Sequence, residues 1–365
     1  MNKKITSLII TGALLSASYA GTVKSRGVSG AGQLSVPVGA HGIALNGTNL
    51  ATVSGVEALY FNPAGASNIS SFETVFSNMN YIADIDVNYA AFATNIGKAG
   101  TFGLSIKSFD FGNIARTSAE NTEGTGETFS PDFMTVGATW SNAFTDRVRF
   151  GVTLKFIQER IMRTSASGTG FDLGVQYTFA DRPIRIGVML SNLGTKMQYA
   201  GSDLEQKLQP AGSAEGTLNE GFQIVSEGFE IPAELNLSAA YEVMPGLSVM
   251  ASYNNNSFSN NEIRFGGEYN QSLGPSSVWV GGAMGMASVD DDKPDGIAQS
   301  DWDEYSGDGV FEIGYMSNSA DPEIRAMYSN SGEAKYWSDA KSYRRVYGFE
   351  FNKVIGNMSF HGEYG

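Results

Sequence analysis

Apolar and polar residues alternate along most of this chain in segments of about ten residues. Between 149 and 157 one face carries Phe150, Val152, Leu154 and Phe156, and the other carries Arg149, Gly151, Thr153 and Lys155. The segments 171–179, 235–242 and 262–269 repeat the pattern. Because successive side chains of a β-strand point to opposite faces, each segment is predicted to be a strand with one apolar face and one polar or small face.

The connections between these roughly fourteen segments differ in length. Short connections fall at 96–98, 145–146, 181–183, 244–246 and 274–275, and long ones fall near 111–130, 194–230, 290–306 and 331–341. Alternation alone also fits a soluble β-sandwich, but short turns that alternate with long loops favour an up-and-down barrel in an outer membrane. Aromatic residues on the apolar face lie close to the short turns, where a barrel contacts the lipid interface: Phe144, Phe179, Tyr241 and Tyr269.

The start of the chain predicts export. Lys3 and Lys4 precede a mostly apolar stretch, and small residues then lead to Ala20, which is the pattern of a cleaved secretory signal over 1–20. Residues 21–70 do not alternate and are expected to form an N-terminal hatch or plug inside the lumen. The remaining residues, 71–365, are predicted to form an all-β, transmembrane, antiparallel up-and-down β-barrel of about 14 strands in a bacterial outer membrane.

Composition and charge exclude several classes of function. The chain has 24 basic and 38 acidic residues, so phosphates would be repelled and nucleic acid is not expected as a partner. It has no cysteine and only two histidines, His41 and His361, near opposite ends, which argues against an enzyme. The glycine-rich segment 27–32 follows no strand, so no nucleotide cofactor is predicted. The acidic segment 290–308 has Lys293 and Trp302 where a calcium loop needs ligands, so it predicts a solvated loop and no metal site.

One short motif in the hatch stands out as a candidate binding site, namely Asn62, Pro63 and Gly65 within Asn-Pro-Ala-Gly. It could hold the hatch against the barrel wall, or the Asn-Pro step could simply end a short helix. Charged residues on the polar faces could line a conduit, or pair across strands to brace a plugged lumen: Arg149, Lys155, Asp172, Arg185, Glu242, Glu262, Arg264 and Glu268.

The motif also carries a family resemblance. The sequence of 60–65, Tyr-Phe-Asn-Pro-Ala-Gly, resembles the hatch motif of the FadL-like superfamily of outer-membrane proteins. Segments 81–85, 90–92, 126–130, 150–159, 170–174, 190–199 and 231–235 are similar to its PorV/PorQ branch, which is associated with type IX secretion. The resemblance covers about residues 30–270 and implies a fourteen-stranded barrel, so that 357–364 would be one strand too many.

The resemblance implies two non-enzymatic roles. A PorV/PorQ-like protein would bind secreted cargo or secretion-system components through exposed loops such as 111–130 and 194–230, and assist their secretion or surface attachment. The alternative is a FadL-like channel that takes up hydrophobic small molecules such as long-chain fatty acids. A purely structural barrel is a third interpretation. The expected partners are therefore outer-membrane lipid, cargo proteins and hydrophobic solutes.

Overall fold

A computed structural model gives the three-dimensional structure of the chain. It describes residues 29–208, 220–258, 261–273, 276–287, 307–317, 323–331, 344–355 and 358–364. The predicted signal at 1–20 and the acidic segment up to residue 306 lie outside these residues.

Long antiparallel strands dominate the described part of the chain. They are β1 (Phe72–Asn80), β2 (Asp86–Asn95), β3 (Thr101–Asp110), β6 (Asp132–Ala143), β7 (Val148–Ile161), β8 (Thr164–Thr178), β9 (Ile184–Gly194), β13 (Glu234–Met244), β14 (Leu247–Asn256), β15 (Glu262–Leu273), β16 (Ser276–Ala287), β17 (Gly307–Ser317), β18 (Glu323–Ser331), β19 (Arg344–Ile355) and β20 (Met358–Tyr364). Each of these long strands pairs with the next one along the chain, except that β17 and β18 are the two ends of the strand order, so the topology is up-and-down as predicted.

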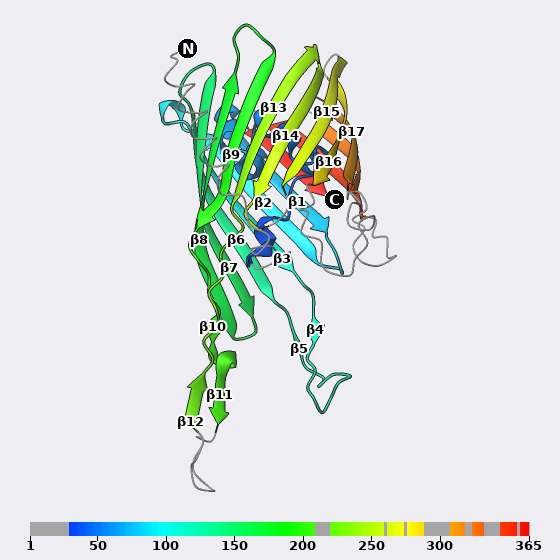
Figure 1. Cartoon of the computed structure of the whole chain (residues 1–365). Coiled ribbons are helices and arrows are strands. Elements are labelled where there is room, and N and C mark those ends of the chain that lie inside the picture. Colours follow the sequence, from blue (N-terminus) through cyan, green and yellow to red (C-terminus); the bar gives the residue numbers. More distant parts are fainter. Residues whose placement is uncertain are drawn as a thin grey trace, which may run out of the picture.

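The strands form one strongly curved sheet, and the two ends of the strand order, β17 and β18, lie next to each other (Figure 1). The order contains fifteen long strands among the described residues, rather than about fourteen, because β20 adds to the edge of β1. The β1–β20 pair is parallel, with Phe72 opposite Met358. Neighbouring strands alternate in direction, so an odd number of strands places the first and last in the same direction.

Side-chain burial confirms the predicted faces. On β7, Leu154 and Phe156 are exposed while Gly151 and Thr153 are buried, and Phe171 and Leu173 on β8 are likewise exposed. The exposed apolar side continues around the sheet through Phe102, Ile106, Trp140, Ile186, Tyr241, Val249, Ile263, Phe265, Tyr269 and Val280. An apolar outer surface of this kind matches the hydrocarbon of a bilayer.

The long connections lie at one end of the sheet, as predicted from the lengths of the connections. Two long excursions extend from the same end of the sheet (Figure 1). One carries β4 (Ile114–Ala115) and β5 (Thr128–Phe129), and the other carries β10 (Ala200–Gly201), η7 (Ser202–Leu204), β11 (Glu205–Leu208) and β12 (Glu220–Gln223). Three connections at this end are exceptions, because the one between β7 and β8 has only two residues and those at 81–85 and 257–261 have five. Long loops face the cell exterior in outer-membrane barrels, so we call this the outer end. The opposite end carries the short turns, including η6 (Gly97–Ala99).

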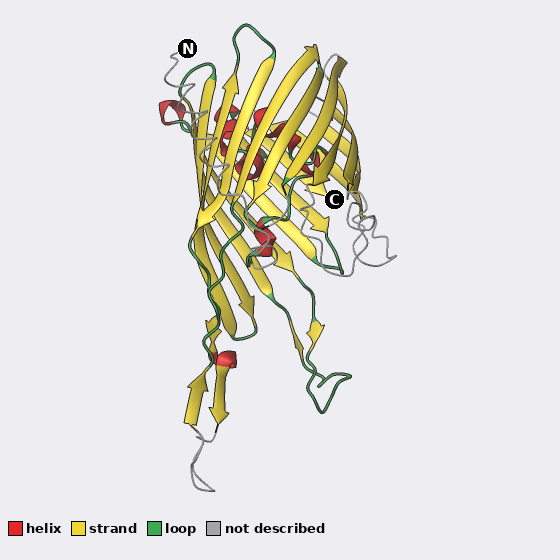
Figure 2. Cartoon of the chain, viewed as in Figure 1, coloured by secondary structure: helices red, strands yellow, loops and turns green. Residues whose placement is uncertain are grey.

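A helical segment precedes β1 and lies inside the curved sheet (Figure 2). Its elements are η3 (Gly32–Leu34), α2 (Ala40–Ala44), η4 (Thr48–Ala51), α3 (Ala58–Phe61) and η5 (Pro63–Asn68). None of the helices in the described residues is long and apolar enough to cross a membrane. We refer to residues 29–71 as the hatch.

Candidate functional site

The Asn-Pro-Ala-Gly motif forms the start of η5. Asn62 is completely buried, and its Oδ1 accepts a hydrogen bond from the backbone N–H of Ala64 at 3.2 Å, which caps the helix. Pro63 occupies the first helical position, where its missing N–H would have had no partner within the helix. The side-chain amide of Asn62 also donates to the carbonyl of Leu50 at 2.9 Å. The motif therefore ties η5 back to η4.

The same motif lies directly against the barrel wall. A Cβ on Gly174 of β8 would be 2.1 Å from Asn62 Oδ1, and a Cβ on Gly151 of β7 would be 2.3 Å from the carbonyl carbon of Pro63. Only glycine fits at such a distance, because real Cβ atoms do not approach other heavy atoms below 3.0 Å. Ser141 of β6 donates its hydroxyl to the carbonyl of Ala64 at 3.1 Å. The small residues on the inner face of three strands thus form the place where the motif docks.

Polar side chains of the wall also hold the hatch backbone. Gln176 of β8 donates to the carbonyls of Leu50 and Val53, at 3.1 and 2.8 Å. Ser238 of β13 donates to the carbonyl of Thr48 at 2.6 Å. Buried backbone carbonyls need such partners, because an unpaired one costs free energy comparable to a lost hydrogen bond. The hatch is consequently fixed by specific contacts from β6, β8 and β13.

The inner face of β1–β3 departs from the predicted polar lumen. It packs apolar side chains against the hatch in one cluster that contains Val36, Leu50, Val53, Leu59, Phe61, Ile69, Val75, Met79, Val87, Tyr89, Ala91 and Phe109. Segment 89–93 is apolar on both faces, which is the pattern of a strand buried on one side and lipid-exposed on the other. That pattern could have located the hatch contact from sequence.

Seven of the eight predicted lumen-facing charges pair, as one of the two interpretations expected, and Arg149 has no ion pair among the described residues. Lys155 of β7 and Asp172 of β8 form an ion pair at 2.6 Å, and Lys155 donates to Asn192 Oδ1 at 2.8 Å. Arg264 bonds Glu262 two residues earlier on β15, with its Nε 2.8 Å from the carboxylate. Further pairs are His41 with Glu57 at 3.1 Å, His41 with Glu268 at 3.4 Å, and Arg185 with Glu242 at 3.9 Å.

A bulge in β9 contributes to this network. The register between β8 and β9 shifts between Phe171 and Leu173, and Asn192 adopts a left-handed backbone with φ of 57°. Asp172 Oδ1 accepts the backbone N–H of Asn192 at 2.8 Å, and the amide of Asn192 donates to the carbonyl of Pro232 at 3.0 Å. The bulge therefore re-aims Asn192 inward, toward the ion pair and the start of β13.

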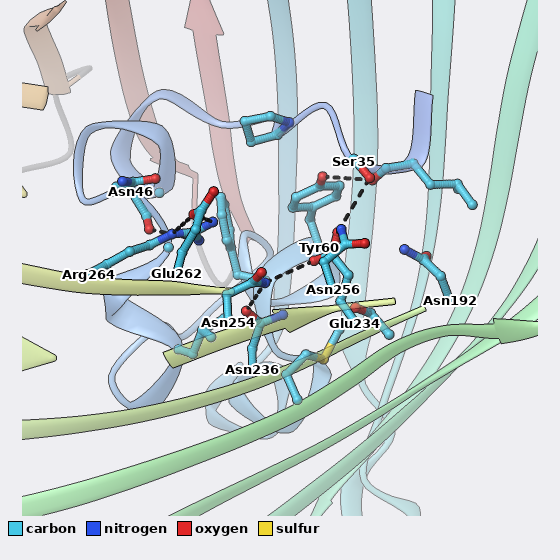
Figure 3. Close-up of a pocket in the computed structure, with 18 of the residues that line it drawn as sticks. Ser35, Asn46, Tyr60, Asn192, Glu234, Asn236, Asn254, Asn256, Glu262 and Arg264 are labelled. Atoms are coloured by element: carbon cyan, nitrogen blue, oxygen red, sulfur yellow. Dashed lines mark hydrogen bonds and ion pairs between the residues drawn. The ribbon is translucent and has the colours of Figure 1, made fainter. Parts of the chain in front are cut away.

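A cavity of about 380 Å³ lies between the hatch and strands β9, β13, β14 and β15. Apart from Lys155 of β7, its strand residues occupy the outer halves of β9 and β13–β15, and η4 contacts the same four strands deeper in the lumen. Figure 3 shows polar side chains converging on it, and the labelled ones are Ser35, Asn46, Tyr60, Asn192, Glu234, Asn236, Asn254, Asn256, Glu262 and Arg264. Its volume is within the range of small-molecule sites.

The predicted motif residues do not line this cavity. Asn62, Pro63 and Gly65 pack between the hatch core and the wall, whereas the preceding Tyr60 and Phe61 face the cavity. Asn236 lies on the polar face of the predicted strand segment 235–242, and no site was predicted there. Within the described residues no group of three or more His, Asp or Glu side chains is arranged to hold a metal ion.

Comparison with known proteins identifies the class of fold. The structure matches the TodX deltaS2S3 mutant, a monoaromatic hydrocarbon channel, with a TM-score of 0.52 and 12% identity over 85% of this chain and 97% of that one. The CymD monoaromatic hydrocarbon channel matches with a TM-score of 0.51 and 10% identity over 88% and 98%. A Pseudomonas aeruginosa FadL homologue matches with a TM-score of 0.47 and 12% identity over 86% and 95%.

The first two likenesses show that this chain has the fold of outer-membrane β-barrel channels. At 12% and 10% identity these likenesses show the fold alone, and nothing in them supports the PorV/PorQ branch of the resemblance. No protein-family model and no curated protein matches the sequence.

Proposed function

We propose that this chain is a bacterial outer-membrane channel through which small hydrophobic molecules are taken up, without catalysis. The observation that carries the proposal is the cavity between the hatch and the outer halves of β9 and β13–β15, in a barrel whose fold is shared with two hydrocarbon channels. The apolar outer surface supports a place in a lipid bilayer, and the predicted signal at 1–20 supports export.

The hatch would act as the gate. It occupies the lumen next to the cavity, so a solute that enters from the outer end reaches the other side only when part of the hatch moves. In this proposal Asn62, Pro63 and Gly65 set the closed position, because they pack so closely on Gly174, Gly151 and Val53 that no Cβ would fit at these glycines. The residues thus control release and do not touch the solute.

An uptake assay tests the proposal. The full-length protein is expressed in a Gram-negative host strain that lacks its own channels for hydrophobic compounds, and accumulation of radiolabelled toluene and of a radiolabelled long-chain fatty acid is measured. Faster accumulation of either compound than in the same strain with an empty vector is expected. If the protein is present in the outer membrane and neither compound accumulates faster than in the empty-vector strain, uptake is refuted.

The resemblance to the PorV/PorQ family leaves a second candidate, namely assistance in type IX secretion or surface attachment of cargo. The observation that favours it is the protruding excursion with β11 and β12, which exposes Phe222, Ile224 and Val225 beyond the barrel (Figure 1). Exposed apolar side chains outside the membrane suit a protein partner. A deletion strain tests it: mass spectrometry of surface and extracellular proteins should show a lost set that accumulates in the periplasm. An unchanged inventory would leave only the channel.

A further inference from the structure

The cavity has two chemically different walls. The hatch supplies most of its apolar residues, namely Leu34, Pro37, Ile43, Leu50, Tyr60 and Phe61. The strands supply most of its polar residues, in rows that the register of the sheet defines. In one row Asn236 lies between Met189 and Asn254, and Asn254 lies next to Glu262; in the adjacent row Glu234 lies between Ser191 and Asn256. A purely apolar solute would leave the second wall without partners.

The polar wall centres on a pair of asparagines. Asn236 and Asn254 stand directly opposite each other on β13 and β14, and the amide of Asn254 donates to Asn236 Oδ1 at 2.6 Å and to Glu234 at 3.3 Å. Both residues are more than nine-tenths buried, with 9% and 5% of their surfaces exposed. Their remaining groups, Asn236 Nδ2 and Asn254 Oδ1, have no hydrogen-bond partner within the described part of the chain, although both residues line the cavity (Figure 3).

The orientation of this pair follows from its neighbour. The carboxylate of Glu234 can only accept, so the amide nitrogen of Asn254 must face it, and the oxygen of Asn254 is left toward the cavity. The pair therefore presents one donor and one acceptor side by side. A buried polar group without a partner costs free energy, so a ligand that satisfies both groups gains affinity.

The ionised residues of the cavity leave little attraction for a charged ligand. Two cations, Lys155 and Arg264, and two anions, Glu234 and Glu262, line it, so their formal charges cancel. Lys155 is already paired with Asp172, and Arg264 with Glu262. Glu234 accepts hydrogen bonds from Ser35, Asn254 and Asn256. The free polar groups of the cavity are therefore the neutral amides.

We propose that the cavity binds a small, neutral amphipathic molecule whose hydroxyl group bridges Asn236 and Asn254 while its apolar body packs on the hatch. A hydroxyl both donates and accepts, as the pair requires, whereas a carboxylate only accepts and an ammonium only donates. This inference rests on the proposed function, in that it names the class of solute that the channel would select.

Four monoaromatic probes that differ only in the group attached to the ring test the inference. Binding of benzyl alcohol, toluene, benzoate and benzylammonium to the purified full-length protein in detergent is measured by equilibrium dialysis. Asn236→Leu and Asn254→Leu, which keep the side-chain size, are compared with Asn78→Leu. Asn78 is a matched control because it forms a cross-strand pair with Asn88 on β1 and β2, away from the cavity.

Benzyl alcohol is expected to bind wild-type protein about tenfold more tightly than toluene and more tightly than either charged probe, since two hydrogen bonds of ordinary strength are gained. Each cavity variant should remove most of this preference and leave toluene binding unchanged, and Asn78→Leu should keep it. Equal binding of benzyl alcohol and toluene, or a preference that survives both cavity variants, would overturn the inference.

The uptake assay separates this result from the proposed function. If toluene accumulates but benzyl alcohol does not bind more tightly than toluene, the proposed channel stands and the proposed hydroxyl site is refuted. If benzyl alcohol binding depends on Asn236 and Asn254 but neither toluene nor the fatty acid is taken up, the binding site stands and the channel is refuted.

Discussion

The carbonyl of Leu50 offers a quantitative test of how the hatch is held, because it accepts hydrogen bonds from two side chains. Asn62, which belongs to the hatch, donates at 2.9 Å, and Gln176 of the wall donates at 3.1 Å. Asn62→Ala removes one of these bonds and the cap of η5, at about 1 kcal/mol each, so the folded hatch should lose about 2 kcal/mol of stability. Gln176→Ala also leaves the carbonyl of Val53 without its donor, at a cost of about 1–3 kcal/mol.

The decisive test is the double variant that combines Asn62→Ala with Gln176→Ala. In either single variant the carbonyl of Leu50 keeps one donor, but in the double variant it keeps neither of the two. We therefore expect the double variant to lose about 1–2 kcal/mol more than the sum of the single variants, which is the cost of an unpaired buried carbonyl.

Hydrogen–deuterium exchange with mass spectrometry measures this effect on the full-length protein in detergent. A loss of 2 kcal/mol corresponds to about thirtyfold faster exchange of the amides at 48–66, whereas the strands should keep their protection. Gln158→Ala is the control, because Gln158 lies on the opposite face of β7 from the buried Ile157 and Glu159. Strictly additive effects, or equal loss of protection in hatch and strands, would refute the reasoning.

Three further predictions concern the wall of the barrel. Gly174→Ala places a Cβ 2.1 Å from Asn62 Oδ1, so the motif must move at a cost of about 1–3 kcal/mol. Conductance in planar bilayers should therefore rise above that of the wild type, and an unchanged conductance would argue against a gate. Lys155→Met leaves the carboxylate of Asp172 buried without its cation, which should lower stability by about 3–5 kcal/mol in urea unfolding, and adding Asp172→Asn should recover most of the loss. Leu154→Arg puts a charge on the lipid-facing side of β7 and should cost about 2–4 kcal/mol in folding titrations with vesicles; no cost would contradict the assigned outer face.

The alternation along each strand by itself determined the fold class and the two faces of the barrel. Leu154 and Phe156 point outward, and Thr153 and the partly buried Lys155 belong to the opposite face, because the side-chain period of a strand is two and does not depend on distant residues. The lengths of the connections likewise separated the two ends of the barrel. These features are local, so a single sequence contains them.

The position of the hatch and the cavity was decided by the tertiary structure. Asn62 and Gly174 are distant in the chain. Nothing in the sequence around either residue indicates that the absence of a Cβ at Gly174 makes room for the side chain of Asn62. Asn236 and Asn254 share the cavity because the register of β13 with β14 sets them directly opposite each other. A one-residue slip would turn one of them to the lipid, and register depends on the packing of the whole sheet. The number of strands depends in the same way on whether β20 finds the edge of β1, which only the assembled sheet determines.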